Sequence, residues 1–206
     1  MASYLTDSGL AASFGLRVTE DGSTTFFSPQ FGETFHSLQG AWQEAVCKFV
    51  EPTRLPELAV TRSPLALLDV CYGLGYNTAA ALLAIWSVNP DCEVVWFGLE
   101  QDLTVVRSGA AHVLASLAAQ GPLVVGADDR SVVDRVAQVI TTLADRDRLV
   151  LSSGSGLVFS GQLLVGDARG SIAQIPDAFQ AEAIFLDPFS PPRCPQLWTC
   201  LLYTSP

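Results

Sequence analysis

From residue 65 onward, short and almost uninterrupted apolar runs alternate along the chain with longer segments in which apolar residues recur at helical spacing. The apolar runs lie within residues 65–71, 93–100, 161–169 and 181–189, and helical patterns cover residues 77–88 and 102–120. Strands without in-out alternation are typical of a parallel sheet that is buried on both faces. The pattern therefore predicts an α/β fold, with a parallel sheet and helices on both faces.

The first 60 residues have a different pattern. Two β-prone runs flank residues 20–23 (EDGS), which predicts a hairpin, and apolar residues at helical spacing predict a helix over residues 33–50. Pro52 and Pro56 are expected to break that helix twice. We therefore expect an N-terminal hairpin and helix over residues 1–60, followed by a core over residues 61–199.

Residues 121–162 interrupt the alternation and are expected to be an insertion in the core. They contain an amphipathic pattern that predicts a helix over 128–148, and the next residues predict a hairpin or two short strands over 149–161. Gly121 is expected to end the preceding helix. Residues 200–206 (CLLYTSP) resemble a translated adapter sequence, so we expect a non-native tail on a C-terminally truncated chain, with an unpaired edge at the strand before Asp187.

Two glycines, Gly73 and Gly75, stand where the first core strand should pass into the first core helix. Glycine permits a tight turn and lets a ligand approach the helix N-terminus closely. Dinucleotides and S-adenosylmethionine both bind at such turns, and a plain strand-to-helix turn has the same pattern. A dinucleotide turn has a third small residue where this chain has Thr78, so S-adenosylmethionine is favoured and a dehydrogenase is the weaker alternative.

Four carboxylates, Asp69, Glu100, Asp167 and Asp187, stand at the ends of four successive apolar runs. The carboxyl ends of parallel strands meet at one edge of the sheet, where the ligands of open α/β sheets bind. A single carboxylate in that position would most simply cap a helix. Four of them in succession indicate a ligand site.

The composition limits the classes of partner. The 206 residues include 11 Lys and Arg against 21 Asp and Glu, a net charge of −10, which argues against nucleic acid because phosphate contacts need clustered basic side chains. Five cysteines without a CxxC pair predict reduced thiols and no metal site. No apolar run is long enough for a membrane span, and the N-terminus lacks a leader pattern, so a soluble cytoplasmic protein is expected.

Four segments between about Phe26 and Thr199 resemble a known family. They are FSPQFGETFHSLQGAWQEAVCKF, LLDVCYGLGYNT, LVL followed by GDAR, and FLDPFSPPRCPQLWT. The chain resembles the class I methyltransferase domain of the MnmC-like family, which completes 5-methylaminomethyl-2-thiouridine at the wobble position of tRNA. The resemblance implies a Rossmann-like fold, S-adenosylmethionine as cofactor and tRNA as substrate. Two sites depart from the family pattern, at Cys71 with Tyr72 and at Pro188, where the family often has glycine.

The resemblance also implies roles for the residues at the strand ends. Gly73 and Gly75 would lie under the methionine end of the cofactor, Glu100 would accept hydrogen bonds from the ribose, and Asp167 would accept one from the adenine amino group. Asp69 is expected to orient the glycine turn.

Asp187 is the predicted catalytic residue, because a carboxylate at this strand end can orient an amine and accept its proton. The alternative is that it only shapes the DPFSPP turn. Phe189 could offer a ring face to the base or to the cationic sulfur. Glu33 lies in a segment that resembles the family's lid, and His36 is expected to line the pocket, although a surface carboxylate and a structural histidine are the simpler interpretations.

Three functions remain open from the sequence. The leading hypothesis is methylation of the aminomethyl group of a modified wobble uridine in tRNA, with Arg54, Arg62 and Arg193 as a local basic patch. The acidic composition favours an alternative, methyl or aminopropyl transfer to a small amine. The third is a binding protein that retains the cofactor fold without turnover. The sequence leaves the exact nucleoside and the oligomeric state open.

Overall fold

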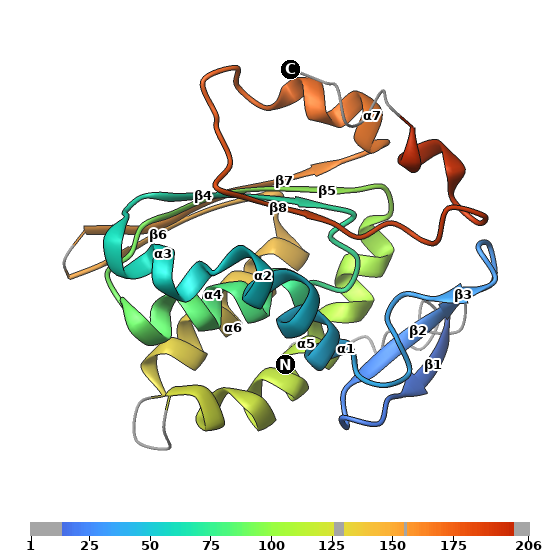
Figure 1. Cartoon of the computed structure of the whole chain (residues 1–206), viewed down its shortest axis with the longest axis horizontal. Coiled ribbons are helices and arrows are strands. Elements are labelled where there is room, and N and C mark those ends of the chain that lie inside the picture. The colour runs from blue at the N-terminus through green and yellow to red at the C-terminus, as the bar shows by residue number, and fades with distance from the viewer. Residues whose placement is uncertain (1–13, 126–129, 155, 200–206) are drawn as a thin grey trace, which may run out of the picture.

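The computed structural model describes residues 14–125, 130–154 and 156–199 (Figure 1). The tail predicted over residues 200–206 lies outside them. The N-terminal part contains β1 (Gly15–Val18), β2 (Thr24–Ser28), β3 (Glu33–Thr34), α1 (Ala41–Ala45), the π-helical turn η1 (Val46–Val50), α2 (Glu51–Thr53) and α3 (Leu55–Thr61). The core follows with β4 (Leu65–Val70), α4 (Tyr76–Val88), β5 (Val94–Glu100), α5 (Leu103–Val125), α6 (Ser131–Asp145), β6 (Arg148–Ser153), β7 (Gly156–Val165), α7 (Ala168–Ser171), η2 (Ile172–Gln174), β8 (Ala183–Leu186) and η3 (Pro195–Trp198).

The core sheet has five strands in the order β6-β7-β5-β4-β8. Strands β7, β5, β4 and β8 run parallel, and β6 pairs antiparallel with β7 at one edge. The predicted α/β class is confirmed, but the sheet is mixed rather than fully parallel. The hairpin predicted over residues 149–161 is present, and its second strand continues into the next apolar run, so that β7 is one strand of 10 residues. Strand β8 forms the other edge of the described sheet, as expected.

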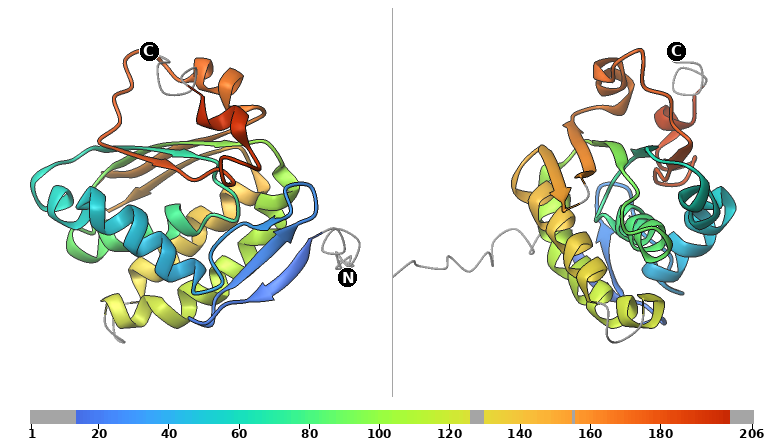
Figure 2. Two further views of the ribbon diagram at one scale, coloured as in Figure 1. Left: turned by 45° about the vertical axis from the view of Figure 1, so that its right-hand side comes forward. Right: turned by 90° about the vertical axis from the view of Figure 1, so that its left-hand side faces the viewer.

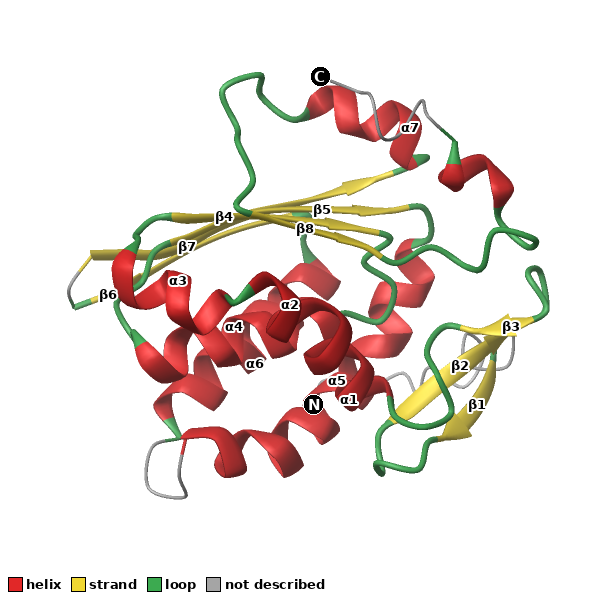
Figure 3. Cartoon of the chain, viewed as in Figure 1, coloured by secondary structure: helices red, strands yellow, loops and turns green. Residues whose placement is uncertain are grey.

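Helices cover both faces of the sheet unequally. The helices α1 to α6 lie on one face, where they build the main hydrophobic core with the strands (Figures 1 and 3). The opposite face carries a smaller cluster that includes Leu68, Val70, Leu99 and Leu164, and it is covered by the segment from α7 to Ala181 and by Leu197. The uncovered part of this face leaves Ile184 exposed.

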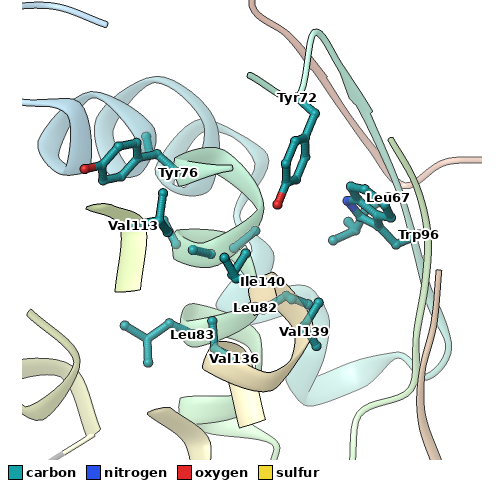
Figure 4. Packing of buried hydrophobic residues seen from close by; sticks show 14 of the residues in the cluster. Leu67, Tyr72, Tyr76, Leu82, Leu83, Trp96, Val113, Val136, Val139 and Ile140 are labelled. Carbon is teal, nitrogen blue, oxygen red and sulfur yellow. The ribbon is translucent and has the colours of Figure 1, made fainter. Parts of the chain in front are cut away.

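In the main core, aliphatic side chains of the helices pack with Tyr72, Tyr76 and Trp96 (Figure 4). Trp86 and Trp96 are fully buried, and Trp42 is 6% exposed. The indole Nε1 of Trp86 donates to the Cys92 carbonyl at 3.0 Å, so its polar atom is satisfied inside the core. Burial of one such ring system contributes roughly 4 to 6 kcal/mol before the entropy of ordering is subtracted.

The helix predicted over residues 33–50 is wrong at its start. Glu33 pairs with Ser28 in the strand ladder, and the amide of Phe35 donates to the Phe26 carbonyl at 2.9 Å, so this stretch extends the hairpin instead. The helix begins at Ala41. Strand pairing therefore outweighed the local helical pattern, as tertiary context commonly does.

The two predicted proline breaks reduce to one. The helical path continues through Pro52, which stands in the first turn of α2 directly after the π-helical turn η1. Pro56 likewise stands in the first turn of α3, where proline is tolerated. The chain breaks only between these helices, at Arg54, whose φ of 53° is left-handed.

Helix α5 does not end at Gly121 as predicted but continues to Val125. A Cβ atom at Gly121 would lie 2.6 Å from a methyl group of Val133 on α6. Gly121 is therefore required by the close approach of two helices, and not by a helix end.

Candidate functional site

The site lies where the strand order reverses. Strand β5 follows β4 on one side and β8 returns to its other side, so the carboxyl ends of β4, β5, β7 and β8 surround a crevice of the kind in which open α/β sheets bind ligands. An open cavity of about 200 Å³ occupies this position. Its lining includes Phe31, Phe35, Gly73, Glu100, Asp167, Asp187 and Phe189. Three of the four predicted carboxylates thus face one cavity.

The glycine turn between β4 and α4 has the backbone that its sequence predicts. Gly73 and Gly75 have φ values of 58° and 100°, which only glycine adopts without strain. A Cβ at Gly75 would lie 2.5 Å from the Tyr72 hydroxyl, whereas a Cβ at Gly73 would meet nothing closer than 3.7 Å. Gly75 therefore permits internal packing, and Gly73 leaves open space on the cavity side. Cys71 adopts a left-handed φ of 68° without being glycine.

Glu100 joins the glycine turn to the next helix. Its Oε2 accepts from the Gly73 amide at 2.8 Å, and its Oε1 accepts from the Asp102 amide at 2.9 Å. The carboxylate of Asp102, not of Glu100, accepts from the Thr104 amide in the first turn of α5. Burial raises the pKa of Glu100, and hydrogen bonds from the backbone amides of Asp102, Gly73 and Gln101 oppose that rise. With three amides bound, the carboxylate keeps one further acceptor position for a ligand.

Asp167 both lines the cavity and begins α7. Its Oδ1 accepts from the amide and from the Nε of Arg169, each at 3.0 Å, and the Arg169 guanidinium also pairs with Oδ2. These hydrogen bonds hold the pKa of Asp167 below its ordinary value. The helix-cap interpretation is therefore true of Asp167, and one acceptor position on Oδ2 remains for a ligand.

Asp69 lies beneath the turn and outside the cavity lining. It is fully buried, its Oδ2 accepts from the Thr78 hydroxyl at 2.6 Å, and its Oδ1 has no hydrogen-bond partner among the described residues. The Thr78 hydroxyl also accepts from the Trp96 indole at 3.0 Å. Burial raises the pKa of Asp69 to about 7. Thr78, the residue that departs from the dinucleotide pattern, thus connects the acid of β4 to the core.

Asp187 follows β8 at the cavity, and its Oδ2 accepts from the side-chain amide of Asn77 at 3.1 Å. Burial raises the pKa of Asp187 to about 6, and the Asn77 hydrogen bond opposes the rise. The carboxylate is therefore mostly ionised at neutral pH and can accept a proton.

The N-terminal sheet closes over the segment that follows Asp187. Phe189 stacks on Phe31 with ring centroids 4.2 Å apart and meets Phe35 edge-on at 4.9 Å. The Glu33 carboxylate accepts from the Ser190 amide at 3.1 Å and from the Ser190 hydroxyl. These hydrogen bonds lower the pKa of Glu33. The aromatic rings and this hydrogen-bonded pair form a cover over one side of the cavity, beside the hairpin seen in Figure 2.

His36 lies behind that cover and outside the cavity lining. The imidazole is buried, its Nδ1 lies 3.1 Å from the Thr25 hydroxyl, and its ring meets Tyr76 edge-on. Burial lowers the pKa of His36 to about 4, so it is neutral at physiological pH. These surroundings are those of a packed structural histidine.

The predicted patch of three arginines does not form at the cavity. Arg62 precedes β4, at the amino end of the strand, and its carbonyl lies beside Cys92 on the edge opposite the cavity. Arg54 forms an ion pair with Glu57 at the break before α3. Arg193 lies beside Gly32, next to the cavity cover.

Sequence reasoning gave no role to Asn77 or Arg169, and it named Tyr72 only as a departure from the family pattern. Arg169 stands two residues after Asp167 and pairs with it, so proximity to the motif was the available signal there. Asn77 lies close to the glycines, but its partner Asp187 is 110 positions away, and spacing gave no signal for that contact. Among residues 14–125, 130–154 and 156–199, no group of three His, Cys, Asp or Glu side chains is arranged to hold a metal ion. No helix in that part of the chain is long and apolar enough to cross a membrane.

Comparisons with known proteins agree with this geometry. A family model described as S-adenosyl-L-methionine-dependent methyltransferase matches residues 132–205. The crystal structure of MnmC2 from Aquifex aeolicus superposes with a TM-score of 0.67 at 30% sequence identity, over 92% of this chain and 55% of that one.

Curated relatives match over most of the chain as well. The tRNA 5-methylaminomethyl-2-thiouridine biosynthesis bifunctional protein MnmC of Paraburkholderia phymatum is 28% identical over 183 residues, which cover 88% of this chain and 26% of that protein. An uncharacterized protein of Methanocaldococcus jannaschii is 28% identical over 186 residues, which cover 88% of this chain and 43% of that protein. The chain thus spans less than half the length of these relatives.

Proposed function

We propose that this chain transfers a methyl group from S-adenosylmethionine to a primary amine on a tRNA base, because it is similar to the S-adenosyl-L-methionine-dependent methyltransferase family model and to the MnmC proteins. The proposed acceptor is the aminomethyl group of a modified wobble uridine. The observation that carries this proposal is the Asp187 carboxylate, which lines the same cavity as Gly73, Glu100 and Asp167. A proton acceptor and a set of nucleoside-binding groups thus share one space. Such a reaction implies the cytoplasm as its compartment.

The residues around the cavity fit S-adenosylmethionine chemically. Glu100 offers a free acceptor position for a ribose hydroxyl, Asp167 offers one for an exocyclic amine, and Gly73 leaves room beside the backbone. The rings of Phe31 and Phe189 present π faces that suit a cation. When bound, the cofactor supplies an electrophilic methyl group on a positively charged sulfur.

The proposed role of Asp187 follows from the chemistry of the acceptor. An alkyl amine resembles lysine, whose reference pKa is about 10.4, so at pH 7 roughly one molecule in a few thousand has a free lone pair, a cost of about 4 to 5 kcal/mol. An ionised carboxylate within hydrogen-bond reach orients the amine and accepts its proton. With a pKa of about 6, Asp187 is in that state at neutral pH.

A small-amine substrate is the second candidate, favoured by the net charge of −10. Arg54 and Arg62 do not supply the clustered basic groups that tRNA would need at this edge, and Arg169 is already paired with Asp167. Arg193 beside the cover remains the basic side chain best placed for a phosphate. A mobility-shift assay with bulk tRNA separates the two candidates, since a small-amine enzyme would leave the tRNA unshifted.

The decisive test is methyl transfer to tRNA. The protein is incubated with labelled S-adenosylmethionine and tRNA that carries the aminomethyl nucleoside, and digested nucleosides are examined by mass spectrometry. We expect one additional methyl group on that nucleoside. A non-catalytic binding protein would bind the cofactor without transferring label to any acceptor.

Asp187→Asn tests the catalytic carboxylate. We expect cofactor affinity within a few fold of the original, methylation slower by on the order of a hundredfold, and a smaller loss at high pH, where the amine deprotonates by itself. Asp177→Asn, an exposed carboxylate outside the cavity lining, is the matched control. Normal turnover of Asp187→Asn at pH 7 would remove Asp187 from the mechanism.

A further inference from the structure

Asn77 carries an unusual hydrogen-bond arrangement for a buried side chain. It stands in the first turn of α4, directly after the glycine turn, and is 2% exposed. Its Nδ2 donates to Asp187 Oδ2 at 3.1 Å, and its Oδ1 is buried without a hydrogen-bond partner in the described part of the chain. A buried carbonyl oxygen without a donor costs stability, so packing alone does not account for an asparagine here.

The orientation of this amide is determined by its neighbour. With the amide turned over, Oδ1 would face the Asp187 carboxylate and two acceptors would repel each other, so Nδ2 must face Asp187. The only hydrogen bond that the Asn77 side chain makes among the described residues is therefore directed at the cavity carboxylate. The contact joins residues 110 positions apart, on α4 and after β8.

The charged and titratable groups around Asp187 act in opposite directions. Glu44 and Asp69 oppose its ionisation, and the Lys48 ammonium favours it. The Cys71 thiol also faces it, with a pKa raised first by burial and then by nearby acidic groups, of which Glu100 has the largest effect. Lys48 pairs directly with Glu44, so the Lys48 charge is partly neutralised and stabilises the Asp187 carboxylate less. The hydrogen bond from Asn77 is thus the one direct stabilising contact to the carboxylate that the described residues supply.

We propose that Asn77 is a positioning residue, whose carboxamide fixes the Asp187 carboxylate in its ionised form at the wall of the cavity. The catalytic consequence of this inference rests on the proposed function, since an amine substrate requires an ionised Asp187. The stability cost of the unpaired Oδ1 is then explained by the requirement for a donor at Nδ2. Functional sites commonly retain such local costs.

The test uses Asn77→Leu, which keeps the volume and removes the donor, together with Asn77→Ala in case leucine fails to fold. Titration of the Asp187 carboxyl carbon by NMR needs no substrate and reports the contact directly. We expect the pKa of Asp187 to rise above about 6 by roughly one unit in either variant. Asn89→Ala is the matched control, because Asn89 also donates from α4's end, to the Ala59 carbonyl.

Two further measurements separate positioning from a structural role. At about pH 4, where Asp187 is protonated in both proteins, Asn77→Leu should melt no earlier than the original protein, because Oδ1 has no partner among the described residues. Loss of a structural asparagine would lower the melting temperature at this pH as well. In methyl transfer, the acidic limb of the pH profile should move to higher pH in the variants. Their kcat should therefore be lower at pH 7 and recover when the assay pH is raised, with cofactor affinity unchanged.

The outcomes distinguish this inference from the proposed function. An unchanged Asp187 pKa in both Asn77 variants overturns the inference, whatever their activity. A raised pKa in a protein that methylates no amine supports the contact and overturns the proposed function. A raised pKa with a shifted acidic limb supports both.

Discussion

Asp69 is a buried carboxylate whose pKa is raised to about 7, so the free energy of unfolding must depend on pH. Its ordinary value is 3.8, so the difference is about 3 units, equivalent to roughly 4 kcal/mol at 1.36 kcal/mol per unit. Because the folded state holds the proton more tightly than the unfolded state, this contribution is fully present below about pH 4. It is lost as the pH rises to about 7 and stays lost above it.

The perturbation is Asp69→Asn, which keeps an oxygen for the Thr78 hydroxyl and cannot ionise. The free energy of unfolding is measured by urea denaturation at intervals from about pH 4 to pH 8. We expect the original protein to lose up to roughly 4 kcal/mol more than the variant over this range. Removal of this charge also favours ionisation of Asp187 and Glu100, which flattens the curve further.

The control is Asp134→Asn, an exposed carboxylate on α6 whose loss changes the net charge by the same amount. Its unfolding curve should keep the slope of the original protein. Parallel curves for Asp69→Asn and the original protein would refute the reasoning, because they would mean that Asp69 titrates alike in the folded and unfolded chain.

Three other substitutions have expected outcomes. Tyr72→Phe removes a buried hydroxyl that has no hydrogen-bond partner in the described part of the chain, and it should raise the free energy of unfolding by about 1 kcal/mol; a loss of stability in denaturant melts would contradict this. Gly75→Ala should cost roughly 1 to 3 kcal/mol, from its φ of 100° and the contact with the Tyr72 hydroxyl, and adding Tyr72→Phe should recover part of it; equal cost in both backgrounds would contradict the clash. Glu100→Ala should weaken S-adenosylmethionine binding at least tenfold in calorimetry, while unchanged affinity would leave Glu100 only joining the turn to α5.

The sequence could predict those parts of the fold whose conformation is determined within a single segment or by a general rule of parallel sheets. The glycine turn was predictable because positive φ at Gly73 and Gly75 requires glycine. The convergence of Glu100, Asp167 and Asp187 followed from a general property of parallel strands, whose carboxyl ends share an edge.

The parts that sequence could not predict depend on contacts between distant segments. Glu33 enters a strand because Ser28 offers it a partner, against a local helical pattern. Gly121 continues a helix because Val133 leaves no room for a larger residue. Asn77 meets Asp187 only after β8 has been inserted beside β4. Residue spacing carries no information about such pairs without an alignment or a structure.

The cover of the cavity has a consequence for how the protein is made. Glu33 and Ser190 are 157 residues apart, and the rings stacked with Phe189 come from the same early segment as Glu33. At a synthesis rate of about 5 to 20 residues per second, the early segment waits roughly 8 to 30 seconds for its partner. Phe31 and Phe35 therefore remain without that aromatic contact while the rest of the sheet emerges. A nascent chain therefore closes this side of the cavity only after residue 190 has been synthesised, and Phe31 stays exposed to other partners until then.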